Sequence, residues 1–191
     1  LITPYYNKSN EEGIYQHFKT VADAVDIPCI LYNIPGRCGC GISEHNVERL
    51  AAHPNIMGIK EASGDVAYAA KIAHLLSDDF RMYSGEDALT VPLMSLGASG
   101  TIGVWADVQP QLVHDMCHAY LDGDVERARD IQIAGQPLIN ALFSEVNPIP
   151  VKAAMELLGL CSGELRLPLC RISERHLEQL SHALEPFRPA V

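Results

Sequence analysis

The sequence lacks any apolar run near the roughly 20 residues that a membrane-spanning helix needs. It also begins without the basic stretch and apolar run of a signal peptide. Basic residues are fewer than acidic ones: the chain has 14 Lys and Arg and 24 Asp and Glu, which gives a net charge of −10. They are scattered, so no basic face for nucleic acid or anionic lipid is indicated. We therefore expect a cytoplasmic protein whose partners are neither nucleic acid nor membrane.

The cysteine pattern excludes further classes of site. Cys38 and Cys40 form C-x-C and not C-x-x-C, so neither a redox pair nor a zinc knuckle is indicated. Disulfide scaffolds are typical of short secreted chains, whereas 191 residues at 48% hydrophobic can bury one substantial core. His114, Cys117 and His118 share a helical face, but no carboxylate completes a ligand set. We expect free thiols and no metal site.

Strand-like and helical segments alternate through the first part of the chain. Runs rich in strand-forming residues occupy 27–33, 55–61, 80–85 and 99–106, and "LITPYYN" resembles the exit of a further strand. Apolar residues at helical spacing occupy 11–26, 43–53, 65–77 and 86–97. Beyond Val108 the pattern is helical only, at 109–143, 148–159 and 173–187. Strands separated by such helices predict β-α-β units and a parallel sheet.

The strand ends favour one α/β architecture. A doubly wound sheet usually has a Gly-rich turn after its first strand, and none is evident. The strands end instead in polar or glycine-containing tips, which suits the carboxyl-terminal rim of a (β/α)8 TIM barrel. Such barrels typically need about 250 residues, so we expect roughly three strands before Leu1. Residues 1–107 would then be about strands 5–8, and residues 108–191 the last barrel helix with a C-terminal helical region. A half-barrel exposes strand edges, so we expect these residues alone to be poorly stable.

The stretch "GIKEASGD" at 58–65 places a lysine at the end of a buried parallel strand. Low dielectric there disfavours the ammonium and lowers the pKa of such a lysine, which leaves a nucleophilic amine. A neutral Lys60 adds to a ketone to form a Schiff base, and the iminium withdraws electrons so that a carbanion forms beside it. The alternative is a structural Lys60 that is paired with Glu61.

Two residues near the preceding strand end have both a functional and a structural interpretation. Neighbouring strand tips bring the phenol of Tyr32 within expected reach of Lys60 for proton transfer, although tyrosine at a strand end also serves packing alone. Arg37 falls in the expected loop 34–41, where its guanidinium suits a bidentate clamp on a substrate carboxylate. The alternative is a solvated loop arginine.

Six motifs together resemble the dihydrodipicolinate synthase and N-acetylneuraminate lyase family of class I aldolases: "TPYYN", "LYNIPGR", "GIKEASGD", "YSGED", "GASGTIGV" and "NPIPVKAAMELLG". They follow the family's order and spacing across nearly the whole chain. The resemblance implies a (β/α)8 barrel that condenses pyruvate with L-aspartate 4-semialdehyde to 4-hydroxy-tetrahydrodipicolinate, on the diaminopimelate route to lysine. It implies no cofactor beyond the covalent pyruvate imine.

The resemblance also implies roles for single residues. Lys60 matches the Schiff-base lysine, Tyr32 the tyrosine that relays protons, and Arg37 the arginine that receives the carboxylate of the semialdehyde. Gly85 and Ile102 match backbone positions near the bound pyruvate.

Self-association is a further implication of the resemblance. Tyr6 matches a catalytic tyrosine that crosses a dimer interface into the partner's active site, and Tyr5 matches one that lines the interface and the lysine effector cleft. The family often assembles as a dimer of dimers, so a homotetramer is expected.

Other functions remain open from the sequence. A rival of the same class is a pyruvate-dependent aldolase for N-acetylneuraminate, a 2-keto-3-deoxy sugar acid or 4-hydroxy-2-oxoglutarate, and a rival of another class is a non-catalytic barrel that binds a small acid. Arg37 favours the semialdehyde, since family members for sugar acids generally lack this "GR". Cys38 departs from the family, which usually has threonine there, and the family's loop with a Thr-Thr pair is not found before Leu1.

Overall fold

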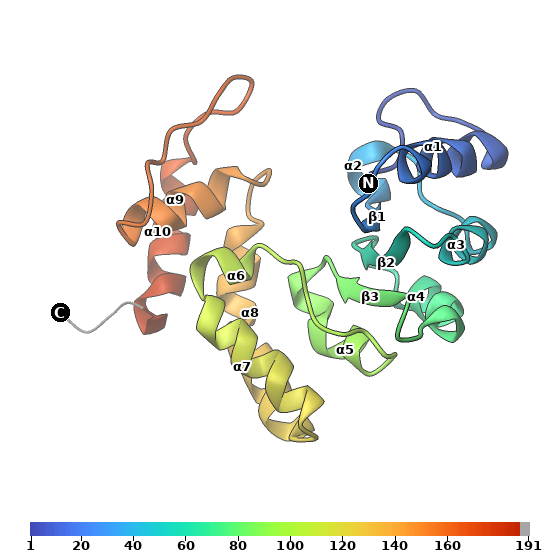
Figure 1. The fold of residues 1–191 in the computed structure, drawn as a ribbon. Coiled ribbons are helices and arrows are strands. Elements are labelled where there is room, and N and C mark those ends of the chain that lie inside the picture. The colour runs from blue at the N-terminus through green and yellow to red at the C-terminus, as the bar shows by residue number, and fades with distance from the viewer. Residues whose placement is uncertain (188–191) are drawn as a thin grey trace. The chain divides into compact units, whose positions relative to one another are not determined.

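The structure, a computed structural model, describes residues 1–187. The last four positions of the predicted helical region, 188–191, lie outside the described residues. The chain divides into two compact units, unit 1 from Leu1 to Ile102 and unit 2 from Gly103 onward (Figure 1). Each unit buries apolar side chains of its own, such as Leu31 in unit 1 and Trp105 in unit 2, both 0% exposed.

Unit 1 contains a parallel sheet of three strands in the order β1 (Cys29–Asn33), β2 (Ile56–Glu61) and β3 (Arg81–Ser84). Single bridges extend it at both edges, from Ile2 to Tyr32 beside β1 and from Thr101 to Ser84 beside β3. Helices connect the parallel strands, as β-α-β units require. This arrangement confirms the predicted α/β fold with a parallel sheet.

The prediction of a fourth full strand at 99–106 is wrong. Within the described residues this segment pairs only briefly with β3, where Ser99 N–H donates to Met82 O and Ile102 N–H donates to Ser84 O, both at 2.8 Å. Pairing ends there because Trp105 begins helix α6 (Trp105–Val108) and is fully buried in unit 2. Its ring fills the space that a Cβ on Gly135 would occupy. Packing in the helical unit therefore overrides the strand propensity of this segment.

The two faces of the sheet differ in burial because successive side chains of a strand alternate between faces. One face carries two rows of strand partners that are at most 2% exposed: Leu31, Ile59 and Met82, then Asn33, Glu61 and Ser84. Helices α1 (Glu11–Asp23), α3 (Glu44–Ala51) and α4 (Val66–Ile72) lie along one side of the sheet (Figure 1). The opposite face carries the half-buried row Tyr32, Lys60 and Tyr83.

Three of these helices begin at side-chain caps that satisfy otherwise unpaired N–H groups of the first turn. Asn10 accepts from Gly13 N, Ser43 from Asn46 N and Asp65 from Tyr68 N.

Two helical segments are more irregular than predicted. The segment 65–77 ends α4 at Ile72 and continues as the 3-10 turn η1 (Ala73–Leu75), and the segment 86–97 divides into η2 (Asp87–Leu89) and α5 (Thr90–Met94).

Unit 2 is helical in its described part, as predicted. The segment 109–143 forms α7 (Pro110–Leu121) and α8 (Val125–Leu142), which are separated at Gly123, where φ is +91°. Helices α9 (Ile149–Leu157) and α10 (Glu174–Leu184) follow, and the turn η3 (Glu185–Phe187) ends the described chain. No helix within residues 1–187 is long and apolar enough to cross a membrane.

Candidate active site

The candidate site lies where the parallel strands of unit 1 end. Tyr32 on β1 and Lys60 on β2 are Cα partners in the ladder, and each is the penultimate residue of its strand. The amine nitrogen of Lys60 lies 4.3 Å from the centroid of the Tyr32 ring. Residues far apart in the sequence are thus brought together by strand register, on the half-buried face of the sheet.

The environment of Tyr32 keeps its phenol protonated at neutral pH. Burial raises the pKa of Tyr32, the positive charge of Arg37 opposes that rise, and Cys38 adds to it. A phenol that holds its proton beside an amine can donate it to an oxygen that leaves during imine formation. The arrangement therefore places an amine beside the ring of a protonated phenol.

Gly85, two residues beyond Tyr83 on the same side of β3, borders the side chain of Lys60. A Cβ on Gly85 would lie 2.8 Å from Lys60 Cε and 3.0 Å from Lys60 Cγ. Its amide donates to Glu61 O at 2.7 Å, which extends the ladder past the end of β3. The missing side chain therefore leaves the space through which the lysine stem passes.

Lys60 and Glu61 do not form the structural pair that was the alternative interpretation. Alternation along β2 places the two side chains on opposite faces of the sheet. The Glu61 carboxylate accepts from Asn33 Nδ2 at 2.7 Å and from Ser63 N at 2.6 Å. Burial raises the pKa of Glu61, against the opposing effect of these hydrogen bonds from Ser63 and Asn33.

The Asn33–Glu61 pair was not identified from the sequence. Asn33 Oδ1 also accepts from Ile42 N at 3.0 Å, so this buried amide links the ends of β1 and β2 to the segment that leads into α3. The alternation of side chains along a strand could have identified this pair. Asn33 and Glu61 immediately follow Tyr32 and Lys60, so both must point to the other face of the sheet. The pair fixes the strand ends from behind the candidate site.

The sequence predicted that Arg37 lies in an irregular loop. It lies instead in the short helix α2 (Pro35–Cys38). Pro35 occupies the first helical position, where its missing N–H costs nothing. Gly39, with φ of +74°, ends the helix in the left-handed conformation. Arg37 is exposed, and its positive charge opposes the rise in the pKa of Tyr32 that burial causes.

The remaining predicted residues lie at the surface of unit 1. Tyr5 is 75% exposed and Tyr6 is 83% exposed, and Tyr6 adopts a φ of +67°, which is uncommon for a bulky residue. Ile102 is 42% exposed, while its amide is fixed by the hydrogen bond to Ser84 O. Tyr5 and Tyr6 thus present aromatic rings to solvent, and their roles at an interface stay a prediction.

A bound metal ion needs several ligating side chains that lie close together. Among residues 1–187, no three or more His, Cys, Asp or Glu side chains gather in a way that would bind one. The rings of His114 and His118 on α7 stack at a centroid distance of 4.1 Å, and His114 Nδ1 lies 3.2 Å from Asp115 Oδ1.

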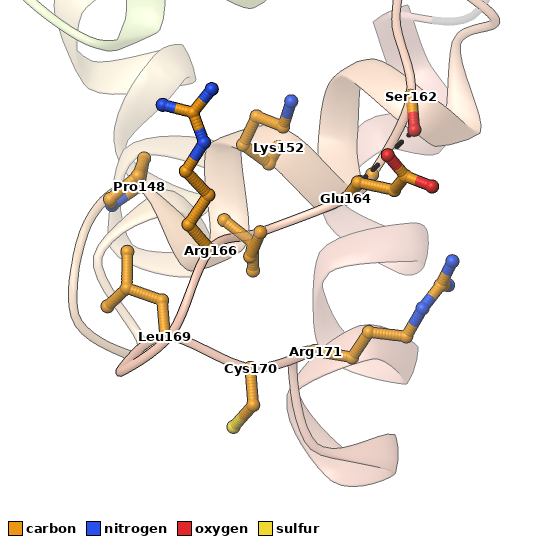
Figure 2. A pocket seen from close by; sticks show the side chains of 10 residues that line it. Pro148, Lys152, Ser162, Glu164, Arg166, Leu169, Cys170 and Arg171 are labelled. Atoms are coloured by element: carbon orange, nitrogen blue, oxygen red, sulfur yellow. Dashed lines mark hydrogen bonds between the residues drawn. The ribbon is translucent and has the colours of Figure 1, made fainter.

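Unit 2 contains a pocket of about 760 Å³ between the start of α9 and the segment 162–171. Lys152 and Arg166 extend in the same direction at its rim (Figure 2). Arg171 pairs with Glu156 at 3.3 Å, and the amide of Glu164 donates to Ser162 Oγ at 3.2 Å. None of the residues predicted from the sequence to act in catalysis or binding lines this pocket.

Comparison with known proteins gives concordant matches. The model of the "Dihydrodipicolinate synthetase family" matches residues 1–186. A 4-hydroxy-tetrahydrodipicolinate synthase of Pseudomonas aeruginosa is 50% identical over 184 residues, which cover 96% of this chain and 63% of that protein. The solved dihydrodipicolinate synthase of Aquifex aeolicus is 43% identical with a TM-score of 0.94, over 97% of this chain and 64% of that one.

A further solved relative carries a ligand. The chloride-inhibited dihydrodipicolinate synthase from Acinetobacter baumannii, complexed with pyruvate, is 43% identical with a TM-score of 0.93, over 97% of this chain and 64% of that chain. The chain therefore spans slightly less than two thirds of the length of the relatives it matches.

Proposed function

Since this chain belongs to the dihydrodipicolinate synthetase family, we propose that it carries the Schiff-base site of a lyase that condenses pyruvate with L-aspartate 4-semialdehyde to 4-hydroxy-tetrahydrodipicolinate. The observation that supports this most directly is the register of β1 and β2. It places the Lys60 amine 4.3 Å from the Tyr32 ring centroid at the carboxyl ends of parallel strands. The pyruvate complex of the Acinetobacter baumannii relative supports the choice of oxo acid.

The proposed fold of the whole protein is a (β/α)8 barrel in which unit 1 supplies about strands 5–8. The edge bridges at Ile2 and Thr101 support this, because they mark positions where the parallel ladder continues beyond β1 and β3. In a closed barrel, the face that carries Tyr32 and Lys60 would point inward, and active sites lie at the carboxyl-terminal mouth.

The proposed reaction begins when the uncharged amine of Lys60 adds to the C2 carbonyl of pyruvate. The carbonyl oxygen leaves as water, for which Tyr32 donates a proton, and an iminium joins Lys60 to C2. The iminium then accepts the electron pair of a C3–H bond as the C3 proton passes to the Tyr32 phenolate. The resulting enamine carbon attacks the aldehyde of the semialdehyde, whose carboxylate pairs with Arg37, and the aldehyde oxygen takes a proton from Tyr32 as the iminium re-forms. The amino group of the semialdehyde then adds to C2 and displaces the Lys60 amine, which closes the ring and frees the lysine.

Self-association is part of the proposal. Tyr6, exposed on unit 1, is assigned to the active site of a partner subunit, and Tyr5 to the same interface in a dimer of dimers. Exposed aromatic side chains are typical of interface anchors, because burying them on association removes a large apolar area from water.

Covalent trapping tests the proposal. The full-length protein is incubated with pyruvate and borohydride, and its peptides are mapped by mass. We expect a reduced pyruvyl adduct on Lys60 that is absent from Lys60→Arg and retained in Lys71→Arg, whose lysine pairs with Glu44 on the helical side of unit 1. An active protein without an adduct at Lys60 would refute the mechanism.

A second assay separates the semialdehyde from the rival substrates. Condensation of pyruvate with L-aspartate 4-semialdehyde is compared with pyruvate release from N-acetylneuraminate, a 2-keto-3-deoxy sugar acid and 4-hydroxy-2-oxoglutarate. We expect turnover with the semialdehyde. Preferred release from one of the other compounds would assign the site to that aldolase, and pyruvate binding without imine formation would favour a non-catalytic barrel.

A further inference from the structure

Lys60 has a second tyrosine beside it, on the strand opposite Tyr32. Tyr83 on β3 is the Cα partner of Lys60 on one side, as Tyr32 is on the other. Neighbouring strands lie about 4.8 Å apart, and side chains of partnered residues point to the same face. The half-buried Tyr83 therefore flanks the lysine from β3 as Tyr32 flanks it from β1.

The space beside Lys60 on the β3 side differs between the positions of Tyr83 and Gly85. Tyr83 and Gly85 share one face, since they are two residues apart, and one is bulky while the other has no side chain. The Lys60 stem passes Gly85, where a Cβ would approach Lys60 Cε to 2.8 Å. Along β3, the open position at Gly85 therefore lies beside the Lys60 stem, and Tyr83 is the preceding residue on the same face.

We propose that Tyr83 is a positioning and specificity residue, whose ring closes the β3 side of the site and restricts the imine on Lys60 to an oxo acid with a small group at C3. This inference rests on the proposed function. An oxo acid that is one methylene longer than pyruvate must place its extra carbon beside the lysine stem. In this proposal, the rings of Tyr32 and Tyr83 on the two neighbouring strands limit the space available to that carbon. One methylene changes discrimination by roughly 10- to 200-fold in a well-packed pocket.

The contributions of the Tyr83 hydroxyl and of its ring volume to the selectivity can be measured separately. If the ring acts through its volume, Tyr83→Phe preserves the selectivity and Tyr83→Leu relaxes it, because leucine is shorter and leaves the far part of the ring's space empty. Tyr15 provides the matched control, since it belongs to the same unit but stacks on Arg49 at 3.5 Å on the helical side.

The test measures borohydride-trapped adducts at Lys60 of the full-length protein with pyruvate and with 2-oxobutanoate, and compares the ratios of their initial rates. We expect Tyr83→Leu to raise the 2-oxobutanoate to pyruvate ratio about tenfold or more, and Tyr83→Phe and Tyr15→Leu to keep the original ratio. Tyr83→Met, whose side chain has a similar volume but is longer and more flexible than leucine, replaces the leucine variant if that one fails to fold, and the same direction of change is expected.

Three outcomes would contradict different parts of the reasoning. An unchanged ratio in Tyr83→Leu or Tyr83→Met, with pyruvate adducts still forming at Lys60, would overturn the role of Tyr83 and leave the proposed function intact. Absence of any pyruvate adduct in the unmodified, active protein would overturn the proposed function, and with it this inference. A changed ratio in Tyr83→Phe would overturn the assignment to ring volume, since only the hydroxyl is lost.

Discussion

Replacing Gly85 with alanine tests whether the Lys60 stem needs the space that the glycine leaves. The added Cβ would lie 2.6 Å from Ala62 Cβ and 2.8 Å from Lys60 Cε. Ordinary carbon–carbon contacts begin near 3.5 Å, so these atoms must separate by about 0.7 to 0.9 Å. Because Gly85 N–H and Glu61 O hold the backbone together at 2.7 Å, the lysine side chain is the part that can move.

The expected size of the effect follows from this overlap. Overpacking in a well-packed region costs about 1–3 kcal/mol, and each 1.4 kcal/mol corresponds to about a tenfold change in rate. If most of this cost falls on the reactive position of Lys60, formation of the pyruvate imine slows by about 5- to 150-fold. Single-turnover reaction with pyruvate, quenched with borohydride at timed intervals, measures this rate as adduct on Lys60.

Two controls separate the contact with Lys60 from general damage. Gly36→Ala adds a methyl group where no atom lies within 4 Å, so its imine rate should equal that of the original protein. Adding Ala62→Gly to Gly85→Ala removes the clash with the Ala62 methyl group and leaves the clash with Lys60. The double variant should therefore recover thermal stability but not the imine rate. A Gly85→Ala protein that forms the adduct at the original rate would refute the reasoning.

Three further predictions follow from other contacts. Arg37→Ala should retain the pyruvate adduct on Lys60 but lose most use of the semialdehyde, and steady-state kinetics with unchanged KM for both substrates would contradict this role. Asn33→Leu should lower the free energy of unfolding by about 1–3 kcal/mol in urea titrations, since the buried Glu61 carboxylate and the Ile42 amide each lose a partner. Hydrogen bonds from Ser173 and His176 lower the pKa of Glu145 from 4.5 to about 2. Its stabilising contribution is therefore present above pH 4.5 and lost as the pH falls toward 2. Glu145→Gln should flatten this part of the acid-unfolding profile, and a profile of unchanged shape would count against the assignment.

The sequence predicts those parts of the fold that depend on local pattern. The runs at 27–33, 55–61 and 80–85 become β1, β2 and β3, because strand-forming residues there are bounded by turn residues. The ends of adjacent parallel strands lie close together, so strand order predicted that Tyr32 and Lys60 are near each other, and the register makes them direct partners. Trp105 shows the limit, since its place in unit 2 depends on the space at Gly135, thirty residues farther along the chain.

The candidate site was predictable only in part, for a related reason. Lys60 stands out because an ammonium is unusual at the end of a buried strand. Glu61 and Asn33 were not identified as a pair, because their contact requires the register between β1 and β2 as well as the alternation within each strand. The helical turn at Arg37 escaped notice too, since four residues that contain a proline and a glycine have no detectable helical period.

Lys60 and Glu61 are consecutive in β2 and point to opposite faces of the sheet, so the strand tolerates changes of length and changes of side chain differently. Deleting a single codon ahead of Lys60 within the strand would swap the two side chains, sending a carboxylate to the half-buried face beside Tyr32 and an ammonium into the layer beneath the helices. Length changes in this strand are therefore far more damaging than exchanges of one side chain for another. An exchange of one side chain on the covered face alters packing or a hydrogen bond there, while the Lys60 amine stays on its own face of the sheet.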